Sequence, residues 1–135
     1  MENKIKPNKK LGQNFLINKY TINTILEILD IKKDDHIIEI GPGKGALTDF
    51  ITSKTKNYIG VEKDNNLCDL LNKKYNNNVK IINEDILKID EKNISNDKLI
   101  VFGNLPYNIS TEIICSWVIK LEKNFWFSKL ILMFQ

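Results

Sequence analysis

The sequence predicts a single α/β domain, in which a parallel β-sheet is covered by helices on both faces. Five short apolar runs alternate with stretches whose apolar residues recur at helical spacing, which is the pattern of successive strand and helix units. The runs are almost continuously apolar, as expected for strands buried on both sides. A content of 42% hydrophobic and 27% charged residues is that of an ordinary globular domain.

The first half of the alternation begins with a helix, which apolar residues at helical spacing place over Thr21 to Leu29. HIIEIG, His36 to Gly41, is expected to form the first strand, and a helix from Ala46 to Ser53 follows a glycine-rich turn. NYIGVE, Asn57 to Glu62, is the second strand, and a helix is expected from about Asn65 to Tyr75.

The second half continues the alternation of strands and helices, with a longer connection between two of the strands. VKIIN, Val79 to Asn83, is the third strand, and the polar segment Lys88 to Asp97 is a connection with little or no helix. KLIVF, Lys98 to Phe102, a helix from Thr111 to Leu121 and KLILMF, Lys129 to Phe134, complete the series. Because no helix follows to cover this last apolar strand, we expect the natural protein to continue.

Charge and cysteine content exclude some classes of protein. Every basic residue is Lys, and Lys4, Lys6, Lys9 and Lys10 at the N-terminus more than supply the net charge of +3. Such a tail is either solvated or bound to phosphate groups. The two cysteines lack metal-ligand spacing, no apolar run approaches ~20 residues, and the polar N-terminal residues do not form the apolar core of a signal peptide. We therefore expect no metal, no membrane span and a cytoplasmic protein, with an organelle left open.

A glycine-rich turn after the first strand is the first candidate ligand site. EIGPGKGALT, Glu39 to Thr48, carries Gly41, Gly43 and Gly45, which let the backbone turn tightly and approach a ligand closely. The string also satisfies G-x-G-x-x-A. By itself it therefore fits a dinucleotide site, a site for another adenosine cofactor or a purely structural turn.

Two acids at the next strand ends favour an adenosine ligand. Glu62 ends the second strand, about twenty residues after the glycine turn, where a carboxylate accepts hydrogen bonds from ribose hydroxyls. Asp85 follows the third strand and can accept from the exocyclic amine of adenine. Each acid alone is also compatible with a helix N-cap. Ile86 and Val61 adjoin the acids, and we expect them to flank the adenine ring.

The fourth strand leads into FGNLPYNIST, Phe102 to Thr111, which is the candidate acceptor site. Asn104, Leu105, Pro106 and Tyr107 combine an amide, a fixed backbone and an aromatic ring without an acid or nucleophile. This set fits methyl transfer to an exocyclic amine. The Asn104 oxygen and the carbonyl of Leu105 or Pro106 would accept hydrogen bonds from the amine. Tyr107 would stack on the unpaired base. A proline turn before a helix is the structural alternative.

Together these motifs resemble the ribosomal RNA adenine N6-dimethyltransferases, over nearly the whole chain. The strings that carry the resemblance are LGQNFL at Leu11 to Leu16, EIGPGKGALT and NLPYNIST. The resemblance, closest to the small-subunit type, implies a Rossmann-like class I fold and S-adenosylmethionine as donor, without a metal. It also implies two adjacent adenosines near the 3′ end of small-subunit rRNA as acceptors. The resemblance implies donor-site roles for Asn14, Leu16, Gly41, Glu62, Asp85 and Asn104. Gly43 of the glycine turn and Ile86 of the expected adenine site complete the set of expected donor-site residues.

The GQNFL segment, which precedes the first helix, fits either a loop packed on the domain or a flap over a ligand. The resemblance favours the flap. It divides the chain into residues 1–20, a basic tail with the flap, and residues 21–135, an incomplete catalytic domain. The helical C-terminal domain that contacts rRNA in bacterial members is expected to be absent. The expected partner is the immature small ribosomal subunit, and the protein is expected to be a monomer.

Two other functions stay open from the sequence. A nicotinamide-dependent oxidoreductase fits G-x-G-x-x-A and Glu62, but Pro42 and the NLPY loop argue against it. A non-enzymatic RNA-binding or ribosome-assembly module fits the basic tail and the incomplete sheet. The related erythromycin-resistance methyltransferases of large-subunit rRNA share the architecture but usually carry Ile where Leu105 stands.

Overall fold

Five parallel strands form one sheet in the computed structural model, which describes residues 6–90, 93–104, 110–120 and 126–133. The strands are β1 (Ile37–Ile40), β2 (Tyr58–Glu62), β3 (Lys80–Asn83), β4 (Leu99–Asn104) and β5 (Phe127–Met133). Their order across the sheet is β3-β2-β1-β4-β5. The sequence order therefore reverses between β1 and β4. The parallel sheet confirms the predicted α/β class.

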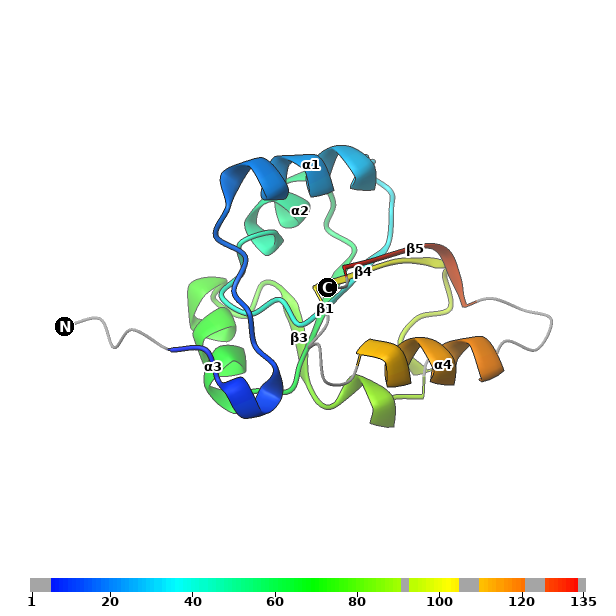
Figure 1. The fold of residues 1–135 in the computed structure, drawn as a ribbon. Coiled ribbons are helices and arrows are strands. Elements are labelled where there is room, and N and C mark those ends of the chain that lie inside the picture. The colour runs from blue at the N-terminus through cyan, green and yellow to red at the C-terminus, as the bar shows by residue number, and fades with distance from the viewer. Residues whose placement is uncertain (1–5, 91–92, 105–109, 121–125, 134–135) are drawn as a thin grey trace.

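Helices cover both faces of this sheet. They are α1 (Lys19–Leu29), α2 (Thr48–Lys54), α3 (Asn65–Lys74) and α4 (Ser110–Lys120), with the 3-10 turns η1 (Lys9–Leu11) and η2 (Ile86–Lys88). Figure 1 shows α1 and α2 on one side of the sheet and α4 on the other. These four helices correspond to the four that helical spacing predicts.

Two helices begin at side chains that accept from free backbone N–H groups. Asn18 accepts from the N–H of Thr21 at the start of α1. Asp64 accepts from the N–H groups of Asn66 and Leu67 at the start of α3. Both helices therefore begin one residue after a polar cap, which places α1 two residues earlier than the apolar spacing alone predicts.

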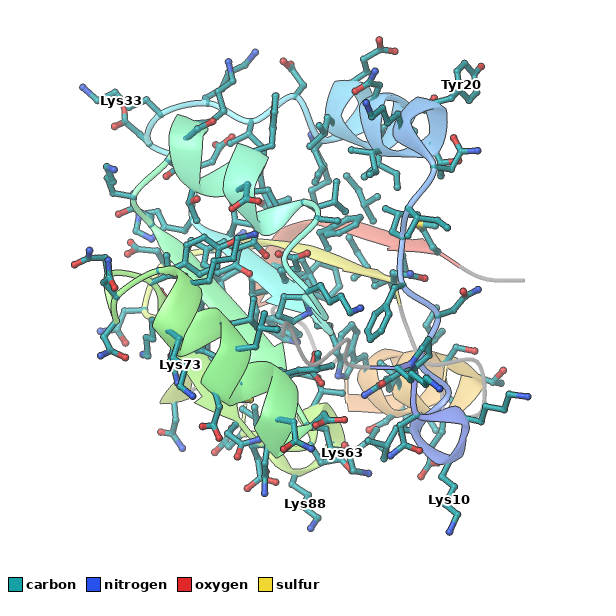
Figure 2. The ribbon with its side chains drawn as sticks, turned by 90° about the vertical axis from the view of Figure 1, so that its left-hand side faces the viewer. Lys10, Tyr20, Lys33, Lys63, Lys73 and Lys88 are labelled. Atoms are coloured by element: carbon teal, nitrogen blue, oxygen red, sulfur yellow. The ribbon has the colours of Figure 1, made fainter. Side chains whose placement is uncertain are left out.

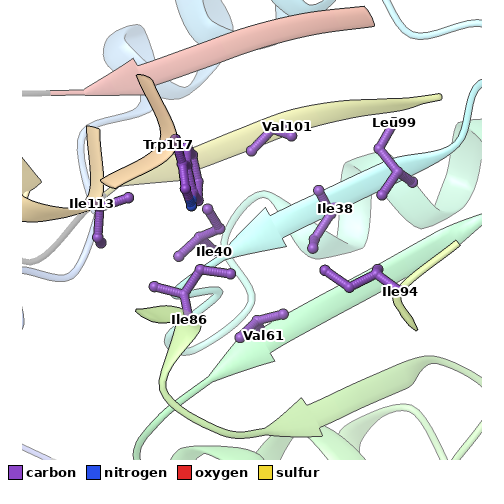
Figure 3. Packing of buried hydrophobic residues seen from close by; sticks show 9 residues of the cluster. All are labelled: Ile38, Ile40, Val61, Ile86, Ile94, Leu99, Val101, Ile113 and Trp117. Atoms are coloured by element: carbon purple, nitrogen blue, oxygen red, sulfur yellow. The ribbon is translucent and has the colours of Figure 1, made fainter. Parts of the chain in front are cut away.

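Two apolar layers enclose the sheet, because successive residues of a strand point to opposite faces. In β1, Ile38 and Ile40 face one layer while Ile37 faces the other. The first layer, between the sheet, η2 and α4 (Figure 3), contains Ile38, Ile40, Val61, Ile86, Ile94, Leu99, Val101, Ile113 and Trp117. The second, between the sheet, α1 and α2, contains Ile25, Leu29, Ile37, Leu47, Ile51, Tyr58, Ile100 and Phe102.

The two edge strands depart from the prediction that every strand is buried on both faces. β3 and β5 contain no fully buried residue, whereas β1 is buried throughout. An edge strand lacks a neighbour on one side, so even apolar residues there stay partly accessible. A second difference lies in β4, which runs two residues beyond Phe102. Asn104 is therefore the last residue of the strand and not the first residue of a loop.

Candidate functional site

A cavity of about 350 Å³ lies at the carboxyl ends of the strands. Its walls come from residues 10–17, from the glycine turn, from the ends of β2 and β4, and from the residues that follow β3. This is the edge where ligands bind in open α/β sheets, beside the point at which the strand order reverses. The volume lies within the range of small-molecule sites, roughly 300–1,000 Å³.

All eight residues expected at the donor site line this one cavity: Asn14, Leu16, Gly41, Gly43, Glu62, Asp85, Ile86 and Asn104. They come from segments as far apart in the chain as Asn14 and Asn104. Val61, expected beside the adenine ring, also lies on the wall, although its side chain belongs to the first apolar layer. The other acceptor residues, Leu105, Pro106 and Tyr107, lie outside the described residues.

The glycine turn closes one side of the cavity. Its N–H groups are held by β2, since Gly41 donates to the carbonyl of Val61 at 2.8 Å and Gly43 to Glu62 Oε2 at 3.1 Å. Gly43 has a φ of +60°, and a Cβ there would lie 3.3 Å from the ring of Phe15. Only glycine combines this backbone conformation with so close a neighbour.

Glu62 binds the glycine turn to the start of α3. Its second oxygen, Oε1, accepts from the N–H of Asp64 at 3.0 Å, and the residue is only 6% exposed. Burial raises the pKa of Glu62, although the N–H groups of Asp64 and Gly43 oppose that shift. Each carboxylate oxygen has a further lone pair. Glu62 can therefore accept from a diol while it still holds the turn.

Asp85 is paired with Lys63, which the sequence reasoning missed. Lys63 Nζ lies 2.8 Å from Asp85 Oδ2, while Oδ1 accepts from the N–H of Leu87 as the N-cap of η2. Partial burial alone would raise the pKa of Asp85, but the bonds from Lys63 and Leu87 outweigh it, so the pKa is lowered. Asp85 thus stays an ionised acceptor. The N-cap role and the binding role considered for it are compatible.

Glu39 is a buried acid that the sequence reasoning did not single out. It lines the cavity but is only 3% exposed, on the β1 face where an apolar residue would otherwise pack. The hydroxyls of Thr48 and Tyr58 donate to Oε2 at 2.7 and 2.6 Å. Burial raises the pKa of Glu39 to about 7 against these two bonds. The available signal was a single acid inside the apolar run IIEI.

An N-terminal strap, residues 8–18, supplies the outer wall of the cavity through its residues 10–17. Figure 2 shows it in blue, running from the turn that carries Lys10 toward Tyr20 on α1. Gln13 Nε2 donates to Asp64 Oδ2 at 2.8 Å. The ring of Phe15 contacts Gly43 and lies under Lys44 Nζ, 4.6 Å from the ring centroid. The segment thus covers the cavity.

Asn104 connects the strap to the sheet. Its Nδ2 donates to the backbone carbonyl of Asn14 at 3.0 Å, a bond that spans ninety residues of the chain. This bond fixes the direction of the amide, because Nδ2 points to the strap and the Oδ1 atom points away from it. An amide held in this way presents a hydrogen-bond acceptor beside the glycine turn.

The described residues contain neither a metal-site cluster nor a helix that could span a membrane. No cluster of three or more His, Cys, Asp or Glu side chains there has the arrangement of a metal site. Within the same residues no helix has the length and apolar character needed to cross a bilayer.

Comparisons with known proteins show which family the chain resembles. The model of the family "Ribosomal RNA adenine dimethylase" matches residues 4–135. Ribosomal RNA small subunit methyltransferase A of Pelagibacter ubique is 52% identical over 132 residues, which cover 97% of this chain and 50% of the relative. The protein of the same name from Malacoplasma penetrans is 44% identical over 135 residues, covering 99% and 48%. The chain spans about half the length of the curated relatives it matches.

Solved structures share the fold. A dimethyladenosine transferase from Plasmodium falciparum superposes with a TM-score of 0.75 at 25% identity, covering 90% of this chain and 43% of the other. The 23S rRNA methyltransferase ErmE gives a TM-score of 0.71 at 25% identity, covering 90% and 48%. A coclaurine N-methyltransferase at 16% identity, with a TM-score of 0.61, covers 87% and 38% and shows likeness of fold alone.

Proposed function

Because the chain belongs to the ribosomal RNA adenine dimethylase family, we propose that it is the donor-binding and catalytic part of an rRNA adenine N6-dimethyltransferase. The acceptors are two adjacent adenosines near the 3′ end of small-subunit rRNA, and the donor is S-adenosylmethionine. One observation carries the proposal: Glu62, Asp85 and the fixed amide of Asn104 line the same cavity. The activity and substrate of a protein of the relatives' length are part of this proposal.

The residues of the cavity fit an adenosine that carries a hydroxylated ribose. Glu62 has free lone pairs for the ribose hydroxyls, and Asp85 is an ionised acceptor for the exocyclic amine. Ile86 supplies an apolar surface next to Asp85, and Gly43 has no side chain to narrow the cavity. When bound, S-adenosylmethionine supplies an electrophilic methyl group. Asn14, Leu16 and Gly41 complete the proposed donor wall.

The acceptor half depends on Asn104. The amino group of adenine is a weak nucleophile because its lone pair is delocalised into the ring. A hydrogen bond from that amine to Asn104 Oδ1 holds the nitrogen in place and favours a pyramidal geometry with the lone pair available. We assign the second acceptor to the carbonyl of Leu105 or Pro106, and the stacking platform to Tyr107. Positioning of this kind lowers the barrier without a strong base.

Delivery of the RNA requires cations near the cavity. Lys10 and Lys44 line it, and the chain contains no Arg, so phosphate groups would be met by ammonium point charges. The proposed partner is the immature small ribosomal subunit in the cytoplasm, which this protein binds as a monomer.

Donor binding and methyl transfer to the acceptor are measured in separate experiments. Isothermal titration calorimetry of the chain with S-adenosylmethionine is expected to show one binding site. A separate titration with NAD tests the oxidoreductase alternative. Transfer of labelled methyl groups to immature small subunits is expected to fall roughly 10²–10³-fold in Asn104→Ala, because the amine loses an aligned hydrogen-bond acceptor.

The matched control is Asn93→Ala, which removes an amide from a surface turn whose partner is Asp90. It is expected to retain transfer. Undiminished transfer by Asn104→Ala would refute the role of Asn104. Binding of NAD with no binding of S-adenosylmethionine would refute the proposed activity.

A further inference from the structure

Gln13 makes a bond that neither the donor nor the acceptor proposal uses. Its Nε2 donates to Asp64 Oδ2 at 2.8 Å, and its Oε1 accepts from the N–H of Asn8 at 2.7 Å. One amide therefore fixes the conformation of the strap and ties it to α3. The bond to Asp64 is partly buried and joins residues 51 positions apart.

The bond is not needed to start α3. Asp64 caps that helix with its other oxygen, Oδ1, which accepts from Asn66 and Leu67. Oδ2 is thus available to hold the strap. Among the neighbouring side chains, Leu16 packs against the second apolar layer and Phe15 contacts Gly43 and Lys44, while Ile17 is 86% exposed. These contacts reach the sheet and the glycine turn, whereas the Gln13 bond ties the strap to the start of α3.

Gln13 and Asn14, which are adjacent in the strap, connect two sets of hydrogen bonds. Gly43 and Asp64 donate to the two oxygens of Glu62, and Asp64 accepts from Gln13. The next residue along the strap, Asn14, supplies the carbonyl that accepts from Asn104. The ribose-binding carboxylate and the acceptor amide are therefore joined through the strap, and the Gln13–Asp64 bond is the link between them.

We propose that Gln13 is a positioning residue: by holding the strap on Asp64 it places the Asn14 carbonyl that orients the Asn104 amide, and it holds closed the outer wall of the donor cavity. The inference rests on the proposed function, and it adds a cavity-lining residue whose two side-chain bonds, to Asp64 and Asn8, are made within the chain itself. Its role depends on a donor at position 13 and an acceptor at position 64.

An exchange of donor and acceptor tests this directly. Gln13→Glu sets a carboxylate against Asp64 and should weaken S-adenosylhomocysteine binding at least tenfold by calorimetry. In Gln13→Glu/Asp64→Asn the bond is reversed: Asn at 64 donates to Glu at 13, whose other oxygen still accepts from Asn8. This double variant should bind within threefold of the wild type. Asn at 64 still caps α3 through its oxygen.

A second measurement separates positioning from stability. The side-chain NH₂ signals of Asn104 in ¹⁵N-labelled protein should shift in Gln13→Glu and return in the double variant, while the thermal unfolding midpoints stay alike. The matched control is Asn66→Asp, which adds a negative charge beside Asp64 without touching the strap bond. It should bind like the wild type.

The outcomes distinguish the two proposals. If the wild-type chain binds no S-adenosylhomocysteine, the proposed function fails. If the wild type binds and Gln13→Glu binds equally well, the role of Gln13 is refuted while the function stands. Loss of binding in both Gln13→Glu and a folded double variant, or an equal loss in Asn66→Asp, also refutes it, because the effect would then not follow the bond.

Discussion

Replacing Glu39 by Gln should remove a large part of the pH dependence of stability. Glu39 is 3% exposed, and burial raises its pKa from the ordinary 4.5 to about 7, against the bonds from Tyr58 and Thr48. An amide in the same place never ionises, and its oxygen can still accept from both hydroxyls. The substitution therefore isolates the cost of a buried negative charge from the loss of the two bonds.

The sign and size follow from proton binding. Between about pH 4.5 and 7 the unfolded chain ionises at Glu39 while the folded protein keeps the proton, so stability falls as pH rises through this window. Above this pH window Glu39 is ionised in both the folded and the unfolded state, and stability decreases no further on its account. Each pH unit between the two pKa values lowers the free energy of unfolding of the wild type by about 1.4 kcal/mol, so the total decrease is roughly 3 kcal/mol. Glu39→Gln has no ionisable group there and should not show this decrease.

Urea unfolding at several pH values from 4.5 to 8 measures this effect. The difference in the free energy of unfolding between Glu39→Gln and the wild type should shift by roughly 3 kcal/mol in favour of the variant across the range. Glu112→Gln, on the exposed side of α4, controls for the removal of one acid. A difference that stays constant with pH, within about 1 kcal/mol, would refute the assignment of a protonated Glu39 to the folded state.

Three further substitutions probe the packing and charges around the cavity. Gly45→Ala should destabilise the protein by roughly 2–4 kcal/mol, since φ is +81° and the new Cβ would lie 2.7 Å from Tyr75 Oη. Adding Tyr75→Phe should recover part of that loss in urea unfolding, and no recovery would contradict the contact. Lys63→Met should raise the pKa of Asp85, because the ammonium at 2.8 Å is lost; carboxyl ¹³C titration by NMR measures it, and an unchanged pKa counts against the pair. Trp117→Ala should cost about 3–5 kcal/mol, because the ring fills the first layer at 3% exposure; a urea midpoint equal to that of the wild type would show that the ring is not packed there.

Much of the cavity wall is predictable because it follows from strand ends. The carboxyl ends of parallel strands meet at one edge of a sheet, so an acid at the end of β2 and another after β3 must approach the glycine turn after β1. The positions of Glu62 and Asp85 could therefore be inferred from their places in the sequence alone. The periodic pattern locates the helix ends to within about two residues, and the largest differences are at the starts of α1, which the polar cap Asn18 sets, and of α2.

The partners of these side chains could not be predicted in the same way. Lys63 and Asp85 pair across 22 residues, and Gln13 and Asp64 across 51, so their contacts depend on how separate elements pack. Glu39 is the sharper case. An acid in an apolar strand is tolerated because Thr48 and Tyr58, from α2 and β2, both reach it. A local sequence pattern cannot predict that both hydroxyls reach Glu39.

The order of strands in the sheet has a consequence for how the protein forms during synthesis. Ile37 pairs with Tyr58 on one side and with Ile100 on the other, three times as far along the chain. Closing the longer loop costs roughly 1 kcal/mol more in chain entropy. The half with β1, β2 and β3 can therefore pair while the rest is still being made. Asn104 and its bond to the strap come after these three strands, so we expect Glu62 and Asp85 to be in place before the amide of Asn104.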